Sequence, residues 1–199
     1  MFLIVSNSIS SQNFDVRLLS SINSEEILNS DKYFRFISNS DAYVIIGTPL
    51  LLAGAGLIRN DDKMLRNAFV VATASILNEG LTYALKYSIN RDRPFETYPE
   101  IVKKTDAGSP SFPSGHTSSA FATATSLSLS YPKWYIIAPS FAYAGTVAYS
   151  RMYLGVHYPS DVAAGALLGA GCAYLTYKVN KALLNKNKHK IKPCNCPDL

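Results

Sequence analysis

Five stretches of this 199-residue chain are apolar and almost free of charged residues. They cover residues 42–58, 67–85, 116–130, 134–149 and 162–177. None of them alternates apolar and polar residues with the period of two that is typical of a half-buried strand, so the pattern predicts helices. The connections at 59–66 and 131–133 are short, whereas residues 86–115 form a loop too long for a mere connection. We therefore predict an all-α fold, a helical bundle of about five apolar helices.

The length of the first apolar segment leaves two environments open for this bundle. Residues 42–58 would form a helix of about 25 Å, compared with about 30 Å for the hydrocarbon core of a bilayer. Pro49 would kink that helix. The mean hydropathy of +0.06 is modest for five spans, so a soluble bundle with buried helices is the alternative. We expect membrane-spanning helices, and Gly165 and Gly169 have the spacing that lets two such helices approach closely.

The two ends of the chain differ from the bundle in composition. Met1–Val5 is a short apolar run that resembles the remains of an export signal, although a weakly apolar N-terminus explains it equally well. Residues 14–41 are polar and mixed, and apolar positions within 14–22 favour a short amphipathic helix. We therefore divide the chain into an N-terminal segment (1–41), a helical bundle (42–178) and a basic C-terminal tail (179–199).

The distribution of positive charge predicts an orientation if the helices span a membrane. The formal net charge is +5, but no basic stripe interleaved with aromatic residues indicates nucleic acid binding. With alternating helices, one face carries the 59–66 and 131–133 connections and the chain from residue 178 onward, which together hold ten of the 19 Lys and Arg residues. The positive-inside rule then places the tail in the cytoplasm and the 86–115 loop outside. The three cysteines, Cys172, Cys194 and Cys196, are too few for a disulfide framework.

The stretch Ser150–Asp161 contains an arginine, a histidine and a carboxylate at spacings that would let them act together in catalysis. Arg151 offers a planar fork of donors that matches the oxygens of a phosphate, and His157 can act as a base, an acid or a nucleophile near neutral pH. Pro159 suits the first turn of a helix, which would let Asp161 reach back to His157 and fix its tautomer. The alternative for these residues is a surface Arg–Asp pair beside an incidental histidine.

Two further polar stretches lie on the same predicted face as Ser150–Asp161. Lys86 and Arg93 follow the second apolar segment, and Ser114, Gly115 and His116 begin the third. Backbone N–H groups at a helix N-terminus favour an anion, and glycine allows its backbone to come close. Cations around an oxyanion, together with a nucleophile and a proton donor, are what phosphoryl transfer requires.

These three stretches resemble the signature motifs of the type 2 phosphatidic acid phosphatases, whose superfamily includes the bacterial class A acid phosphatases and the vanadium haloperoxidases. The resemblance covers residues 80–170. It implies a metal-independent phosphatase without a cofactor, in which His157 is the nucleophile that forms a phosphohistidine and His116 protonates the leaving oxygen. It further implies that Asp161 orients His157. The implied phosphate ligands are Lys86, Arg93, Ser114, Gly115 and Arg151.

The resulting hypothesis is a membrane-embedded phosphohydrolase whose substrate is a phosphatidate, a phosphatidylglycerophosphate or a polyprenyl diphosphate. The site would lie on the extracytoplasmic face of a bacterium-like cell membrane. A soluble exported acid phosphatase is the main alternative, and a haloperoxidase or a non-catalytic membrane binding protein are lesser ones. Membrane members of the family usually have six spans, whereas the pattern here predicts five.

Glu79 is not explained by these motifs. A carboxylate within an apolar segment is costly unless it is paired, and Glu79 lies two helical turns before Lys86. We favour a structural ion pair near the site over a catalytic role.

Overall fold

The computed structural model of the chain describes residues 14–23 and 29–190, with the side chains of residues 29 and 187–190 left aside. The suggested export signal at residues 1–12 and the cysteines at 194 and 196 lie outside the described residues. Five long helices form the bundle: α2 (Asn29–Arg59), α3 (Asp62–Ile89), α5 (Gly115–Ser130), α6 (Trp134–Tyr153) and α7 (Pro159–Lys190). A short helix, α4 (Pro94–Thr97), and a helix at residues 14–22 complete the described part of the chain, which contains no strand. The predicted all-α bundle is confirmed.

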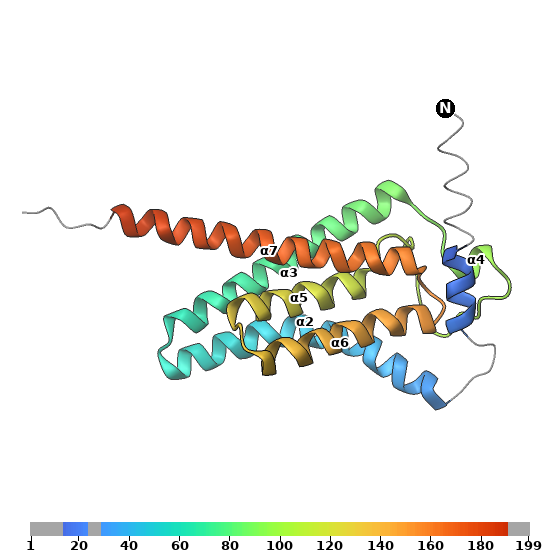
Figure 1. The fold of residues 1–199 in the computed structure, drawn as a ribbon, viewed down its shortest axis with the longest axis horizontal. Coiled ribbons are helices and arrows are strands. Elements are labelled where there is room, and N and C mark those ends of the chain that lie inside the picture. Colours follow the sequence, from blue (N-terminus) through green and yellow to red (C-terminus); the bar gives the residue numbers. More distant parts are fainter. Residues whose placement is uncertain (1–13, 24–28, 191–199) are drawn as a thin grey trace, which may run out of the picture.

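The long helices alternate in direction, so the connections gather at two opposite ends of the bundle (Figure 1). The 14–22 helix, α4, the 90–114 loop and the turn at residues 154–158 lie at one end. The turn at residues 60–61, the break at residues 131–133 and the end of α7 lie at the other. All three polar motifs lie in the first set of connections or in the helix turns next to them, so one end of the bundle carries all of them.

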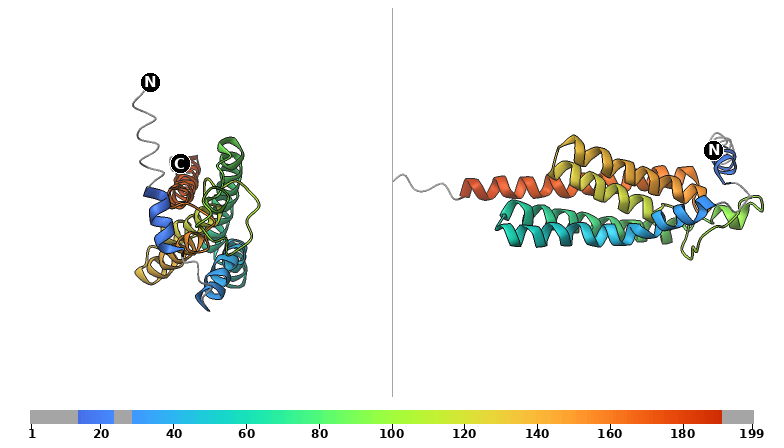
Figure 2. Two further views of the ribbon diagram at one scale, coloured as in Figure 1. Left: turned by 90° about the vertical axis from the view of Figure 1, so that its right-hand side faces the viewer. Right: turned by 90° about the horizontal axis from the view of Figure 1, so that it is seen from below.

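Two of the helices extend well beyond the apolar segments predicted for them. α2 begins at Asn29 rather than at residue 42, and α7 runs on to Lys190 rather than ending near residue 177. The polar start of α2 is helical because it packs against the site end of the bundle, where Asp31 accepts hydrogen bonds from Tyr153 Oη (2.8 Å) and Lys104 Nζ (3.2 Å). The end of α7 projects past the other helices in Figures 1 and 2.

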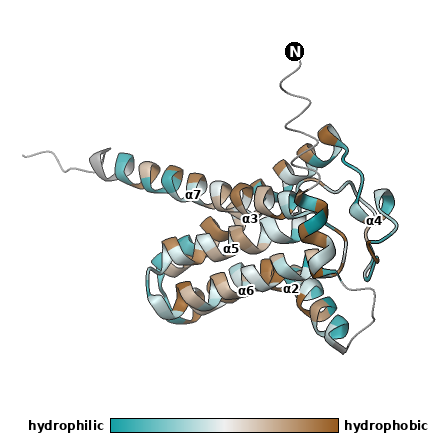
Figure 3. Ribbon diagram, turned by 45° about the vertical axis from the view of Figure 1, so that its right-hand side comes forward, coloured by the Kyte–Doolittle hydropathy of each residue, from teal (hydrophilic) through white to brown (hydrophobic). Residues whose placement is uncertain are grey.

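Apolar residues recur along the five long helices of the bundle (Figure 3), and many of their large side chains are exposed. Three of the described helical stretches are long and apolar enough to cross a membrane: Ser30–Arg59, Asp62–Thr97 and Pro159–Lys186. Large side chains such as Leu51, Ile58 and Ile76 point outward and are more than 70% exposed. A soluble monomer rarely exposes so many large apolar side chains, so lipid is the environment that this surface fits.

The contact between α5 and α7 depends on two glycines. A Cβ atom at Gly165 would lie 2.6 Å from the carbonyl oxygen of Ser114, and a Cβ atom at Gly169 would overlap the carbonyl oxygen of Ser118. The predicted close approach at these positions is therefore confirmed. Since α5 carries His116 and the start of α7 carries Asp161, this contact fixes the separation between two parts of the site.

The 14–22 helix lies across the site end of the bundle (Figure 1), and the short amphipathic helix predicted there is confirmed. Leu19 is fully buried against Ile101 and Tyr158. Asp15 pairs with Arg91 and also accepts a hydrogen bond from the Ser160 hydroxyl. This helix thus ties the 90–114 loop to the start of α7.

Candidate active site

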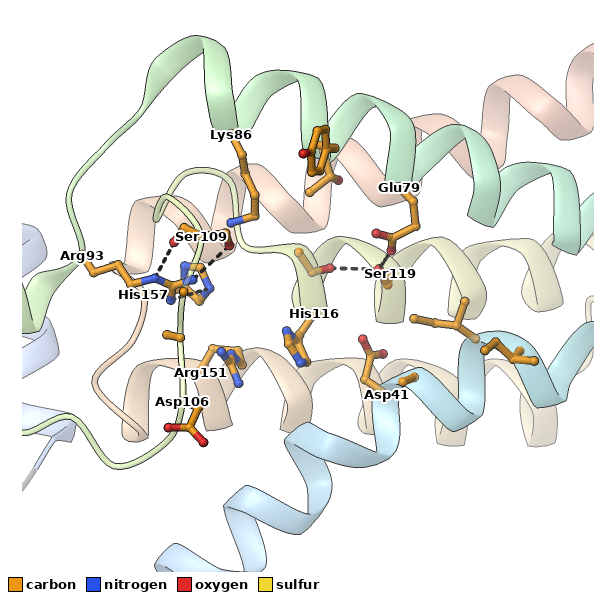
Figure 4. Close-up of a pocket in the computed structure, with 18 residues that line it drawn as sticks. Asp41, Glu79, Lys86, Arg93, Asp106, Ser109, His116, Ser119, Arg151 and His157 are labelled. Carbon is orange, nitrogen blue, oxygen red and sulfur yellow. Dashed lines mark hydrogen bonds between the residues drawn. The ribbon is translucent and has the colours of Figure 1, made fainter.

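One cavity of about 610 Å³ opens where the three polar motifs meet (Figure 4). Seven of the eight predicted site residues contribute to it or stand directly behind it, and they come from four helices and two loops. Lys86 and Glu79 come from α3, Arg151 comes from the last turn of α6, and His116 lies in the first turn of α5. The alternation of the helices therefore brings together residues that are more than 70 positions apart in the sequence.

His157 and Asp161 form the centre of the site. α7 begins at Pro159, as predicted, so Asp161 lies in its first turn and faces back toward His157. His157 Nδ1 is 3.6 Å from Asp161 Oδ2, which is longer than a direct hydrogen bond. Catalytic hydrogen bonds are often this long before a substrate binds. Both side chains are buried, His157 being 1% exposed and Asp161 0%.

The carboxylate of Asp161 is fixed by a network that the motifs did not reveal. Its Oδ1 accepts a hydrogen bond from Arg91 Nη1 at 2.6 Å, and its Oδ2 accepts from Ser111 Oγ at 2.5 Å and from the backbone N–H of Tyr158 at 3.0 Å. Arg91 and Ser111 lie in the long loop and have no distinguishing pattern around them, so no signal in the sequence marks them as partners of Asp161.

The imidazole of His157 is neutral at physiological pH. Burial lowers the pKa of His157 to about 3, and the positive charges of Arg151 and Arg93 act in the same direction, while Asp161 opposes them. The other ring nitrogen, Nε2, is 3.4 Å from Arg93 Nη1 and faces the cavity (Figure 4). A neutral imidazole with its Nδ1 beside a carboxylate presents Nε2 as the free nucleophilic nitrogen.

Three cations surround the cavity around His157. Arg93 donates one hydrogen bond from Nε to Ser109 O (2.8 Å) and another from Nη1 to Val156 O (2.7 Å). Lys86 Nζ donates to Pro110 O at 2.6 Å. Arg151 Nη1 donates to Ser38 Oγ at 2.5 Å, while its buried Nε has no hydrogen-bond partner among the described residues. Backbone carbonyls thus orient two of the cations without neutralising them, and all three charges are available to an anion.

The start of α5 supplies backbone donors, but Ser114 is turned away from the cavity. Gly115 and His116 line the cavity, whereas Ser114 is the N-cap residue and is completely buried. Its N–H donates to Asp161 O at 3.0 Å, and its hydroxyl is 2.9 Å from Thr117 Oγ1. A contact between the Ser114 hydroxyl and a phosphate therefore stays a prediction, and it requires this hydroxyl to leave Thr117.

Three carboxylates also line the cavity: Asp106 lies beside Arg151, and Asp41 and Glu79 lie on the side of His116 away from His157 (Figure 4). Glu79 Oε1 accepts a hydrogen bond from the Ser119 hydroxyl and takes part in no ion pair within the described residues, so the predicted structural ion pair is absent there. Asp41 was not among the predicted site residues. It is a charged residue at the edge of the first apolar segment, and the reasoning applied to Glu79 would have selected it.

No group of three His, Cys, Asp or Glu side chains in the described part of the chain is arranged to hold a metal ion.

Comparison with known proteins places the chain in a family. Residues 66–184 match the PAP2 superfamily. The chain is 35% identical over 171 residues to the undecaprenyl-diphosphatase of Sulfolobus acidocaldarius, and the match covers 83% of this chain and 78% of that protein. The crystal structure of LpxE from Aquifex aeolicus superimposes with a TM-score of 0.70 at 30% identity, over 82% of this chain and 94% of the other.

The crystal structure of a transmembrane PAP2-type phosphatidylglycerolphosphate phosphatase from Bacillus subtilis has the same fold. Its TM-score is 0.70 at 24% identity, over 98% of this chain and 95% of the other. The helical bundle, its apolar outer surface and the motifs assembled at one end are consistent with these matches. The chain is a membrane-spanning member of the PAP2 superfamily.

Proposed function

We propose that the protein hydrolyses a lipid phosphate through a phosphohistidine intermediate on His157. The observation that carries this proposal is the orientation of that imidazole, with Nδ1 on the Asp161 side and Nε2 facing the cavity beside Arg93. An anion-binding pocket alone would need the three cations but no neutral, oriented histidine. The combination is suited to nucleophilic attack on a phosphorus atom.

The reaction proceeds in two displacements. In the first, His157 Nε2 attacks phosphorus and the bond to the lipid oxygen breaks. His116 takes up a proton when the bound phosphate offsets the charges of the three cations, and it gives that proton to the leaving oxygen, so that the lipid leaves as an alcohol. In the second, His116 takes a proton from a water molecule that attacks the phosphohistidine, and inorganic phosphate leaves. Lys86, Arg93 and Arg151, with the backbone N–H groups at Gly115, stabilise the charge on the transferring phosphoryl group.

The walls of the cavity support a lipid substrate. On the α2 side they consist of Asp41 followed by the apolar residues Ala42, Ile45 and Ile46. Ile45 and Ile46 also line a second, almost purely apolar groove of about 470 Å³ between α2 and α3, which continues to Leu65 and Ala68. A hydrocarbon chain in this groove would have its phosphate at the cationic end. The large apolar surface of the bundle favours this proposal over a soluble exported acid phosphatase.

Substrate identity and the face of the membrane belong to the same proposal. Undecaprenyl-diphosphatase is the name of one relative and phosphatidylglycerolphosphate phosphatase that of a fold neighbour, so both lipid monoesters and polyprenyl diphosphates are candidate substrates. Ten of the 19 Lys and Arg residues lie in residues 59–66, in residues 131–133 and from 178 onward, and of the other nine Lys86, Arg93 and Arg151 line the cavity. This distribution supports an extracytoplasmic active site.

The intermediate provides the decisive test. With a ³²P-labelled lipid phosphate, a rapid quench in base should trap label on the protein, because phosphohistidine is stable in alkali and labile in acid. His157→Ala should lose both labelling and turnover. His116→Ala should slow turnover of an alkyl phosphate by about 10²–10⁴-fold and that of an activated aryl phosphate much less, since an aryl oxide leaves without a proton. Labelling of His157→Ala, with none of His116→Ala, would reverse the two roles.

A further inference from the structure

Asp41 on α2 has no role in the proposed displacements, yet it is built into the cavity. Its side chain is 3% exposed and faces the cavity in Figure 4. Its Oδ1 is buried and has no hydrogen-bond partner in the described part of the chain. A buried carboxylate oxygen without a donor is costly. Its position on the cavity wall indicates that a ligand supplies the donor.

Glu79 on α3 faces Asp41 across the same part of the cavity (Figure 4). Its Oε1 accepts the Ser119 hydroxyl, which leaves Oε2 for another donor. The two carboxylates are close enough that Glu79 disfavours a negative charge on Asp41. The two carboxylates therefore form one acidic region, to which α2 and α3 each contribute a side chain.

The geometry of phosphoryl transfer determines what reaches this region. The attacking and leaving atoms lie roughly in line on opposite sides of phosphorus. His157 is the attacking group, and His116 is placed to protonate the leaving oxygen. In Figure 4 the order across the cavity is His157, then His116, then Asp41 and Glu79. The first atoms of the leaving group beyond the scissile bond therefore lie beside the two carboxylates, before the chain enters the apolar groove at Ile45 and Ile46.

The charges of the cavity differ between its two sides. Among the described residues that line it, Lys86, Arg93 and Arg151 are the Lys and Arg side chains, and all three lie on the His157 side of His116 in Figure 4. Asp106 also lies on that side, which therefore carries three cations and one carboxylate, whereas the other side carries the carboxylates of Asp41 and Glu79. Carboxylates accept hydrogen bonds from hydroxyl and ammonium groups and repel phosphate. A diphosphate substrate would place its second phosphate against Asp41 and Glu79 with no additional cation to neutralise it.

We infer that Asp41 and Glu79 form a leaving-group subsite that binds a hydrogen-bond donor, a hydroxyl or an ammonium group, next to the scissile phosphate. The preferred substrate class is then a phosphomonoester on a hydroxyl- or amine-bearing lipid headgroup, and a diphosphate is disfavoured. This inference rests on the proposed function, since it uses the positions of the attacking and leaving atoms.

A matched substrate series tests the donor requirement. The series consists of three detergent-solubilised phosphates, each with a hexadecyl ether on a three-carbon backbone. They carry a hydroxyl, an amino group or a hydrogen at position 2 of that backbone, and they differ only at this atom, which is expected beside the carboxylates. The hydroxyl or the amino compound should exceed the 2-deoxy compound at least about tenfold in kcat/KM, because a site built to bind a donor rejects the analogue that lacks it. Whichever of the two compounds has the larger kcat/KM relative to the 2-deoxy compound identifies the donor that the subsite binds. In Asp41→Leu this preference should disappear.

A second pair of substrates, farnesyl phosphate and farnesyl diphosphate, tests the charge. Glu79→Gln should raise the kcat/KM ratio of diphosphate to monophosphate about tenfold, because it removes a like charge beside the second phosphate. Asp41→Asn should raise this ratio less, because burial and the neighbouring Glu79 already disfavour a charge on Asp41. Asp62→Asn is the matched control, since Asp62 is an exposed carboxylate in the first turn of α3, at the opposite end of the bundle. The side chain of Glu79 is more exposed than that of Asp41, so Glu79→Gln is the less disruptive change. If Asp41→Asn fails to fold, Glu79→Gln still tests the charge.

The outcomes separate this inference from the proposed function. If the wild-type protein releases phosphate from none of these compounds, the proposed function is wrong. If it hydrolyses the three ether phosphates equally, or if both carboxylate variants keep the wild-type diphosphate ratio, the leaving-group subsite is wrong and the phosphatase proposal stands. Mg²⁺ that accelerates only diphosphate hydrolysis, and only while Asp41 is present, would show that the carboxylates hold a metal ion and would also overturn the inference.

Discussion

Gly169→Ala should disrupt the contact between α5 and α7, and a neighbouring glycine provides the control. The added Cβ would overlap the carbonyl oxygen of Ser118 and lie 2.9 Å from the backbone nitrogen of Ala122. Both atoms belong to the backbone of α5 and cannot rotate away, so the two helices must separate. Gly171 lies two residues further along α7, and a Cβ added there meets no atom within 4 Å.

The magnitude follows from comparing the two variants. Each replacement gains about 0.5–1 kcal/mol of helix propensity, and this gain cancels in the comparison. Overpacking typically costs about 1–3 kcal/mol, and the backbone contacts at Gly169 favour the upper part of that range. We therefore expect Gly169→Ala to be about 2–3 kcal/mol less stable than Gly171→Ala. For a domain of this size the difference in Tm is roughly 4–12 °C.

The same separation should reduce activity, because α5 carries His116 and Gly115 at the site. A displacement of about 1 Å near the chemistry can cost about 10²-fold in rate. Thermal unfolding in detergent and phosphate release from a lipid phosphate measure the two effects on the same preparations. Equal Tm values for Gly169→Ala and Gly171→Ala, or full activity of Gly169→Ala, would refute the packing argument.

Four further predictions test the site and its orientation. Arg91→Gln should lower kcat for an aryl phosphate by roughly 10–100-fold, because Asp161 loses a 2.6 Å charge-assisted partner, and the exposed Arg66→Gln should have no effect; equal loss in both variants would contradict this. Since burial lowers the pKa of His157 to about 3, the nucleophile stays neutral as the pH falls from 7 to 4. The kcat/KM for an aryl phosphate, corrected for substrate ionisation, should therefore show no enzyme protonation near pH 6.5, and an inflection there that His157 controls would be contrary evidence. Activity should survive EDTA and be inhibited by vanadate, which can occupy the phosphate pocket, whereas loss with EDTA and recovery with Mg²⁺ would refute the role of the cations. In a cysteine-free background, Glu100→Cys should react with an impermeant thiol reagent in intact cells and Lys133→Cys only after lysis; the reverse pattern would invert the topology.

The local pattern of the sequence was sufficient to predict the helices and the end of the bundle that carries the site. The apolar segments are close to one bundle length each and are joined by polar connections, so consecutive helices must run in opposite directions. Lys86, Arg93, His116 and Arg151 each lie at a helix end or in a loop on the same side. The first turn of α7 is likewise local, because Pro159 favours a helix start and places Asp161 four residues after His157.

The partners of these residues depended on tertiary structure. The hydrogen bonds from Arg91 and Ser111 to Asp161 join positions 70 and 50 residues apart, and no periodicity relates such positions. The start of α2 at Asn29 was missed because its polar residues are paired with Lys104 and Tyr153, which a hydropathy pattern cannot register. Asp41 faces Glu79 only because α2 and α3 lie on opposite sides of the cavity. The helices follow from the spacing of apolar residues along the chain. The charges around the proposed phosphate position follow from residues that only the folded structure brings together.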